Sequence, residues 1–154
     1  MTKRSIPTGA LEALIPYRSP TEPVARVMLT AFRRLAAAGL HDAHATNILI
    51  SHFGMAYHRP MMFLRVLVAE LSRIAQRQIH IAPCCCTRMT TGEAAFLTAI
   101  QTAREQPGSA RATLARMTAS LDCLPALSVA QALADALDDI GRPLIIDCSR
   151  ICLD

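Results

Sequence analysis

The sequence predicts a single all-α domain, a compact bundle of five or six antiparallel helices. The composition is 52% hydrophobic and 18% charged, which is typical of a globular chain with a sizeable apolar core. Apolar residues recur at intervals of three and four, the period of a helix that is buried on one face. Short connections that contain glycine or proline separate these segments. A length of 154 residues suits one domain.

Three helices are expected in the first half of the chain. The first has Pro23 at its opening position, where the missing N–H of proline does no harm, and Gly39 closes it. Asp42 is expected to cap the second helix, which Gly54 ends. The third is expected over residues 60–78. It is apolar over most of its circumference, so we predict that it lies at the centre of the bundle.

Three further helices are expected in the second half. Thr90 and Glu93 have the spacing of a capping box, in which the Glu93 carboxylate reaches back to the Thr90 amide. Ser109 and Ser128 are the expected N-caps of the two helices that follow. The expected ranges of these helices are 91–104, 109–121 and 128–140.

The two ends of the chain are expected to lie outside this helical domain, which spans residues 21–143. Residues 1–20 form an irregular N-terminal arm, because proline, glycine, serine and threonine recur there. Residues 144–154 are expected to be a packed C-terminal tail. The tail begins with β-branched residues at 145 and 146, but one short strand without a partner is only marginally stable.

Charge and hydropathy exclude several function classes. The net charge of +4 comes from scattered arginines, and only 4% of residues are aromatic, which argues against a nucleic-acid partner. The basic start lacks the apolar stretch of a signal peptide. The most apolar segment, residues 61–71, contains Arg65 and Glu70 and is too short to span a membrane. We therefore expect a cytoplasmic protein with reduced thiols, free of any membrane.

The most informative motif is the cysteine triplet of Cys84, Cys85 and Cys86. It lies just before the helix expected at Thr91, whose N-terminal dipole, together with Arg88, favours the thiolate form of a nearby cysteine. Reactive thiol chemistry or metal binding would follow from that. The alternative is that these cysteines are small apolar residues packed into a turn between helices.

A metal site is the second hypothesis for the triplet, with zinc or another thiophilic ion as the cofactor. Three consecutive thiols diverge, and their spacing is unlike the paired cysteines of common zinc sites. The expected ligands are therefore Cys84, Cys86 and His80. The fourth ligand would come from elsewhere in the fold, with Cys123 and His44 as the candidates. Cys148 and Cys152, near the C-terminus, are expected to serve packing.

Two segments of the chain are similar to a bacterial family of unknown function. One is HIAPCCCTRMTTGE, from His80 to Glu93, with the pattern His-x3-Cys-Cys-Cys-x-Arg-Met-Thr-x2-Glu. The other is DAHA, from Asp42 to Ala45. The resemblance covers about residues 24–143 and implies an all-α domain. Since that family has no assigned function, it implies no activity, cofactor or partner.

We interpret the chain as a small binding or regulatory module whose cysteine-rich turn binds a thiophilic metal or senses thiol oxidation. Its expected partner is another protein or a second copy of this chain. A thiol-dependent redox enzyme with His80 as base is one alternative, and a structural or interaction subunit with buried cysteines is another. The module is favoured over the enzyme because the sequence offers no complete set of nucleophile, base and orienting group.

Overall fold

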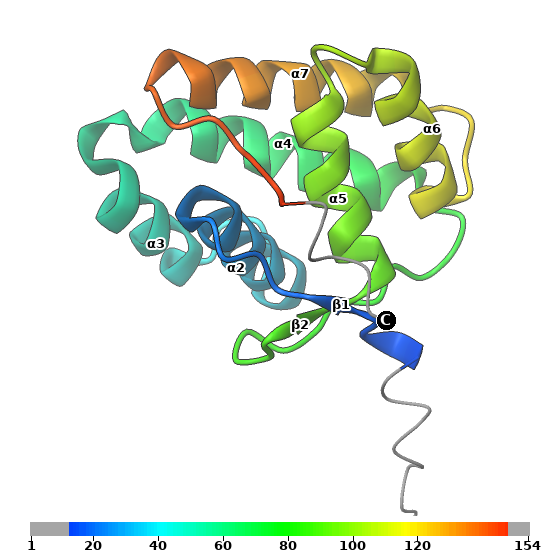
Figure 1. Ribbon diagram of the computed structural model, residues 1–154, viewed down its shortest axis with the longest axis horizontal. Coiled ribbons are helices and arrows are strands. Elements are labelled where there is room, and N and C mark those ends of the chain that lie inside the picture. The colour runs from blue at the N-terminus through cyan, green and yellow to red at the C-terminus, as the bar shows by residue number, and fades with distance from the viewer. Residues whose placement is uncertain (1–12, 148–154) are drawn as a thin grey trace, which may run out of the picture.

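The computed structural model describes residues 13–147. Over this range the chain folds into six α-helices, a short 3₁₀ helix and a small two-stranded sheet, which confirms the predicted all-α fold (Figure 1). The helices are α2 (Pro23–Ala38), α3 (Ala43–Phe53), α4 (His58–Ile74), α5 (Thr91–Thr102), α6 (Pro107–Thr118) and α7 (Leu124–Asp139). The 3₁₀ helix η1 (Gly54–Tyr57) joins α3 to α4, and the strands are β1 (Tyr17–Arg18) and β2 (Arg88–Met89).

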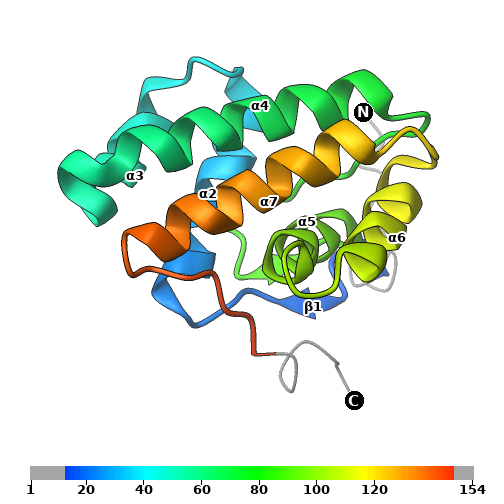
Figure 2. The same cartoon turned by 90° about the horizontal axis from the view of Figure 1, so that it is seen from above.

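The helices pack mainly in pairs. Helix α4 lies against α7, α2 against α3, and α5 against α6 (Figure 1). Seen from above, α4 and α7 run side by side, and α5 and α6 lie on the other side of α7 (Figure 2). The rings of Phe32 on α2 and Phe96 on α5 stack with centroids 3.9 Å apart and planes 5° from parallel. Both rings are buried, so this contact joins the two helices that carry the candidate site.

Helix α4 has one buried face and one exposed face. The buried face consists of apolar side chains at helical spacing: Met61, Leu64, Leu67, Val68, Leu71 and Ile74. Met62 and Val66 on the opposite face are 51% and 43% exposed. Helix α4 therefore packs against the bundle through one face, whereas its largely apolar circumference predicted a helix at the centre of the bundle. None of the described helices combines the length and apolar character needed to cross a membrane.

The end of α4 comes earlier than expected. The helix stops at Ile74 rather than near residue 78, and Ala75 is extended with ψ 119°. The N–H of Gln76 donates to the carbonyl of Thr118 at 2.8 Å, so a contact with α6 replaces the next helical hydrogen bond. The chain from residue 75 onward thus runs along α6 before it reaches the cysteines.

The starts of α6 and α7 also differ from expectation. Ser109 and Ser128 were expected as N-caps, but both lie inside helices. Proline occupies the first turn of each helix instead, as Pro107 in α6 and Pro125 in α7. Proline suits this turn because its fixed φ is helical and the N–H it lacks would have no intrahelical acceptor.

The two strands connect the N-terminal arm to the segment after the cysteines. Tyr17 pairs with Met89 and Arg18 with Arg88 in an antiparallel ladder. The Arg88 side chain continues this contact, since its Nε donates to the Ile15 carbonyl at 2.9 Å. No pattern in the sequence predicts this pairing, because each strand has only two residues.

The described part of the C-terminal segment packs on α5. Leu144 and Ile146 are 7% and 5% exposed, whereas Ile145 between them points outward. The N–H of Ile146 donates to the side-chain oxygen of Gln101 at 3.2 Å. This segment therefore covers part of the apolar core.

Candidate functional site

The cysteine triplet lies in the connection between α4 and α5, as predicted. We call residues 75–90 the triplet loop. The N–H of Cys86 donates to the Pro83 carbonyl at 2.9 Å, so residues 83–86 form a tight turn. Cys84 and Cys85 are exposed at this turn, and Cys86 is half-buried. Two thiols are thus presented to solvent, which the packing interpretation of the triplet did not expect.

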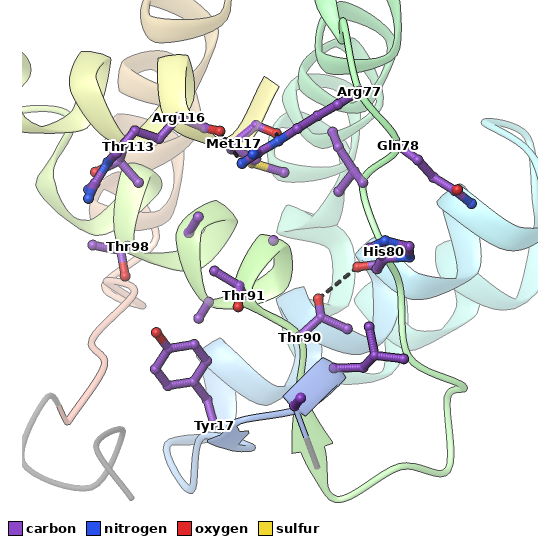
Figure 3. Close-up of a pocket in the computed structure, with 16 residues that line it drawn as sticks. Tyr17, Arg77, Gln78, His80, Thr90, Thr91, Thr98, Thr113, Arg116 and Met117 are labelled. Carbon is purple, nitrogen blue, oxygen red and sulfur yellow. Dashed lines mark hydrogen bonds between the residues drawn. The ribbon is translucent and has the colours of Figure 1, made fainter. Parts of the chain in front are cut away.

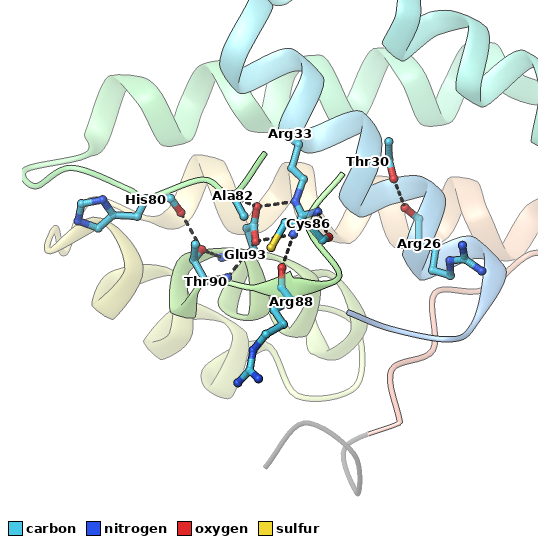
Figure 4. A network of polar contacts seen from close by, with 9 residues as sticks. All are labelled: Arg26, Thr30, Arg33, His80, Ala82, Cys86, Arg88, Thr90 and Glu93. Atoms are coloured by element: carbon cyan, nitrogen blue, oxygen red, sulfur yellow. Dashed lines mark hydrogen bonds and ion pairs between the residues drawn. The ribbon is translucent and has the colours of Figure 1, made fainter. Parts of the chain in front are cut away.

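A buried ion pair lies beneath the turn. Nε of Arg33 on α2 is 2.7 Å from Oε1 of Glu93 on α5, and Nη2 is 3.0 Å from Oε2 (Figure 4). The two side chains are 3% and 0% exposed. Two parallel, charge-assisted hydrogen bonds of this kind fix the relative orientation of guanidinium and carboxylate.

Arg33 also binds the backbone of the triplet loop. Its Nη1 donates to the carbonyl of Cys86 at 2.8 Å, and its Nη2 donates to the carbonyl of Arg88 at 2.6 Å. Four hydrogen bonds therefore leave this one guanidinium, and two of them hold the segment that follows the exposed thiols.

Glu93 binds the loop from the other side. Its Oε1 accepts the N–H of Ala82 and its Oε2 accepts the N–H of Thr90, both at 2.9 Å. The Thr90 hydroxyl accepts the Glu93 N–H at 3.1 Å, which completes the predicted capping box, and donates to the His80 carbonyl at 2.7 Å (Figure 4). The loop is thus tied to Arg33 and Glu93 both before and after the cysteines.

Arg34, the next residue on α2, faces a different set of partners. Its guanidinium donates to Asp42 through Nε at 3.0 Å and Nη2 at 2.7 Å, and Nη2 lies 3.2 Å from Nδ1 of His44. Asp42 also accepts the Ala45 N–H at 2.9 Å and so caps α3, as predicted. The Arg34 hydrogen bond, followed by that of the Ala45 N–H, lowers the pKa of Asp42 to about 2.

Arg34 also interacts with a side chain of the cysteine triplet. The pKa of Arg34 is raised first by its hydrogen bond to Asp42 and further by interaction with the Cys84 side chain. Arg88, expected in this role, points away from the triplet and donates to the carbonyls of Ile15 and Pro16 (Figure 4). The expectation for Arg88 is therefore wrong, because strand pairing draws its side chain towards the N-terminal arm.

The five expected metal ligands do not come together. Cys123 is buried between α6 and α7, where its thiol donates to the Ser120 carbonyl at 2.9 Å. The Arg34 guanidinium interacts with both His44 and Cys84. Among residues 13–147, no group of three or more His, Cys, Asp or Glu side chains is arranged to hold a metal.

The other two cysteines of the chain, Cys148 and Cys152, lie outside the described residues, so their expected packing role stays a prediction.

Sequence reasoning missed the role of Arg33. A signal was present, because Arg33 lies four residues after Leu29 and eight after Ala25, both on the buried face of α2. A charged residue at such a position needs a buried partner. The identity of that partner, sixty positions away, could not be read from local spacing.

The comparisons with known proteins identify a family. Neither a curated protein nor a solved structure matches the chain. Residues 10–143 match the family of unknown function DUF6628, and this match spans all six helices, the triplet loop and both members of the buried ion pair. With most of its length covered, the chain belongs to this family.

Proposed function

We propose that the protein is a thiol-based regulatory module in which the cysteine turn is reversibly oxidised. The observation that carries the proposal is the pairing of two exposed thiols, Cys84 and Cys85, with a backbone held in place by the buried Arg33–Glu93 pair. Such thiols are accessible to an oxidant, whereas the buried thiol of Cys123 is protected.

The energetics of the ion pair support this proposal. Taking two charges out of water is costly, and apolar residues of similar volume commonly stabilise a fold as well or better. At this position the pair does what apolar residues cannot, because it binds four backbone groups of an irregular loop: the carbonyls of Cys86 and Arg88 and the N–H groups of Ala82 and Thr90. A fixed loop that presents reactive groups from a rigid scaffold is a common design of functional sites.

The proposed chemistry uses a hydroperoxide as oxidant. The Cys84 sulfur attacks the O–O bond and becomes a sulfenic acid, while the second oxygen leaves as water or an alcohol. A second thiol then attacks the sulfenic sulfur, an S–S bond forms, and the sulfenic oxygen leaves as water. Cys84 is the proposed first thiol to react, because it is exposed at the turn and Arg34 places a positive charge near it.

The geometry of a disulfide indicates the second cysteine. Adjacent Cα atoms are about 3.8 Å apart, which is less than the roughly 4.4 to 6.8 Å found across disulfides. Cys86, two positions from Cys84 across the turn, fits this range better than Cys85. A Cys84 to Cys86 bond would also shift the backbone at Cys86 and so weaken the hydrogen bond between its carbonyl and Arg33. Oxidation would thereby loosen the loop from α2, and this is the proposed regulatory output.

The experiment is a hydrogen peroxide titration of the reduced full-length protein, followed by alkylation and peptide mass spectrometry. The proposal expects a Cys84 to Cys86 disulfide that dithiothreitol reverses, with Cys123 unmodified as the internal control. Cys84→Ser should abolish the bond, and the matched Cys85→Ser variant should retain it. Irreversible sulfonic acid at Cys84 without any disulfide, or oxidation of Cys123 at the same peroxide dose, would count against the proposal.

A further inference from the structure

A second feature of the molecule is a cavity that is lined by both ends of the triplet loop but not by its cysteines. It has a volume of about 570 Å³ and lies between α5, α6 and the chain at residues 77–80 (Figure 3). This volume falls within the range of pockets that hold small organic molecules, about 300 to 1,000 Å³. Figure 3 shows labelled side chains from β1, α5 and α6 around this space.

Much of the cavity wall is apolar. The apolar side chains that line it come from four parts of the chain and are Ala13, Leu14, Ile79, Ala94, Ala95 and Met117. The wall at the start of α5 is tightly closed, because a Cβ at Gly92 would lie 3.0 Å from the Ile79 side chain. The Thr90 hydroxyl holds the same wall through the His80 carbonyl. This wall of the cavity is therefore held in place and suited to an apolar body.

The charged groups at the cavity, among residues 13–147, are all of one sign. Arg77 and Arg116 line it, and no aspartate or glutamate of this part of the chain does. Arg77 is engaged, because it donates to the carbonyls of Arg116 and Met117 at the end of α6. Within residues 13–147 no acceptor for the Arg116 guanidinium is found. One guanidinium is thus held in place and the other is available to an anion.

We infer that this cavity binds a small organic carboxylate with an apolar chain or ring. The apolar wall would hold the body of the ligand, and Arg116 would pair with the carboxylate. Guanidinium groups bind carboxylates through parallel hydrogen bonds. A ligand with an apolar body and a carboxylate would therefore match both the apolar wall and the arginine. The inference is independent of the thiol chemistry proposed above.

The test is isothermal titration of the reduced full-length protein with octanoate, alongside the neutral 1-octanol. Saturable binding of one octanoate per chain is expected, with weaker binding of 1-octanol. Arg116→Gln should weaken octanoate binding by about tenfold, the loss expected for a hydrogen bond between charged groups. Arg111→Gln, an exposed arginine on the same helix that does not line the cavity, is the matched control and should bind like the wild type.

A filling variant places the ligand inside the cavity. Ala95→Leu adds volume to the apolar wall and should abolish octanoate binding, and thermal melting should show that the variant stays folded. Three results would overturn the inference: no saturable binding of octanoate, equal affinity for octanoate and 1-octanol, or undiminished affinity in Arg116→Gln.

Discussion

Arg33 and Arg34 are consecutive residues of α2, and each pairs with one carboxylate, but their surroundings are opposite. The side chain of Arg33 is 3% exposed and that of its partner Glu93 is 0% exposed. Arg34 is 30% exposed and its partner Asp42 is 9% exposed. Consecutive positions of a helix lie about 100° apart around the axis, so one side chain enters the core between α2 and α5 while the other follows the surface towards α3.

Because of this difference, the two arginines have different roles at the triplet loop. Arg33 acts on the backbone, since it binds the carbonyls of Cys86 and Arg88 and so fixes where the turn lies. Arg34 acts on a side chain, since its charge interacts with Cys84. Buried ion pairs are sensitive to the loss of one partner, whereas exposed pairs contribute little to stability. The two arginines should therefore give distinct phenotypes, one in folding and one in reactivity.

The largest expected effect comes from neutralising Glu93. Glu93→Gln leaves the Arg33 charge buried without a counter-charge, so we expect the free energy of unfolding to fall by about 3 to 5 kcal/mol. Urea denaturation followed by circular dichroism measures this loss. Glu105→Gln, which removes an exposed carboxylate just after α5, is the control and should change stability little.

A double replacement distinguishes the charge from the side-chain volume. Arg33→Met combined with Glu93→Leu removes both charges, and we expect the double variant to be more stable than Glu93→Gln alone. Its loop would nevertheless lose four backbone contacts, so exchange of the amide protons of Ala82 and Thr90 should become faster. A Glu93→Gln variant as stable as the wild type would show that the buried Arg33 charge does not need the Glu93 counter-charge.

A smaller effect on stability, which depends on pH, is expected at Asp42. Its pKa in the folded protein is about 2, below the ordinary value of 3.8, chiefly because of the Arg34 hydrogen bond. A lowered pKa stabilises the fold above the ordinary value, and this contribution is lost as the pH falls from about 4 to about 2. Asp42→Asn retains a capping side chain but not the charge. The urea midpoints of wild type and variant should therefore differ at pH 7 and converge near pH 2.

The control for this measurement is Asp139→Asn, which removes a carboxylate from the exposed pair with Arg59. We expect it to shift the midpoint at pH 7 less than Asp42→Asn does, because exposed pairs contribute little. A difference between wild type and Asp42→Asn that is equally large at pH 2 and pH 7 would contradict the assigned role of the charge.

Local signals explain which parts of the fold were predictable. Pro23 and Gly39 bound the helix that the structure has at Pro23–Ala38, and the capping box of Thr90 and Glu93 places the start of α5 correctly. Each of these signals acts within one or two helical turns. The cysteine triplet could be placed in a loop for the same reason, because the start of the next helix was readable.

Long-range contacts explain what was missed at the site. Glu93 was expected to cap a helix, and it does, but its pairing with Arg33 depends on how α2 packs against α5. Nearness in sequence predicts Arg88 as a cation of the triplet, whereas Arg34 interacts with Cys84 in the folded chain and Arg88 binds the N-terminal arm. A charge's partner depends on tertiary packing, so spacing along the chain identified the thiols but not their electrostatic environment.

The smallest expected effect is a change in the reactivity of one thiol. Arg34→Gln removes the cation that interacts with Cys84, and the loss of this positive charge is expected to make the sulfur less reactive towards alkylating reagents. We expect Cys84 to react with neutral iodoacetamide a few-fold more slowly at pH 7.5. The accompanying loss of thermal stability should be no larger than that of Asp42→Asn, because both variants remove the same hydrogen bonds. Mass spectrometry of the labelled peptide, in a Cys85→Ser background that simplifies the assignment, gives the rate.

Arg26→Gln is the matched control for this measurement, because Arg26 is an exposed arginine on the same helix without a side-chain partner among the described residues. Its rate of Cys84 labelling should equal that of the wild type. Added salt should reduce the difference between wild type and Arg34→Gln, since the interaction lies near solvent and is screened. If Arg34→Gln and Arg26→Gln react alike at low salt, Arg34 does not set the reactivity of Cys84. The role in thiol reactivity assigned here to Arg34, as opposed to Arg33, would then be wrong.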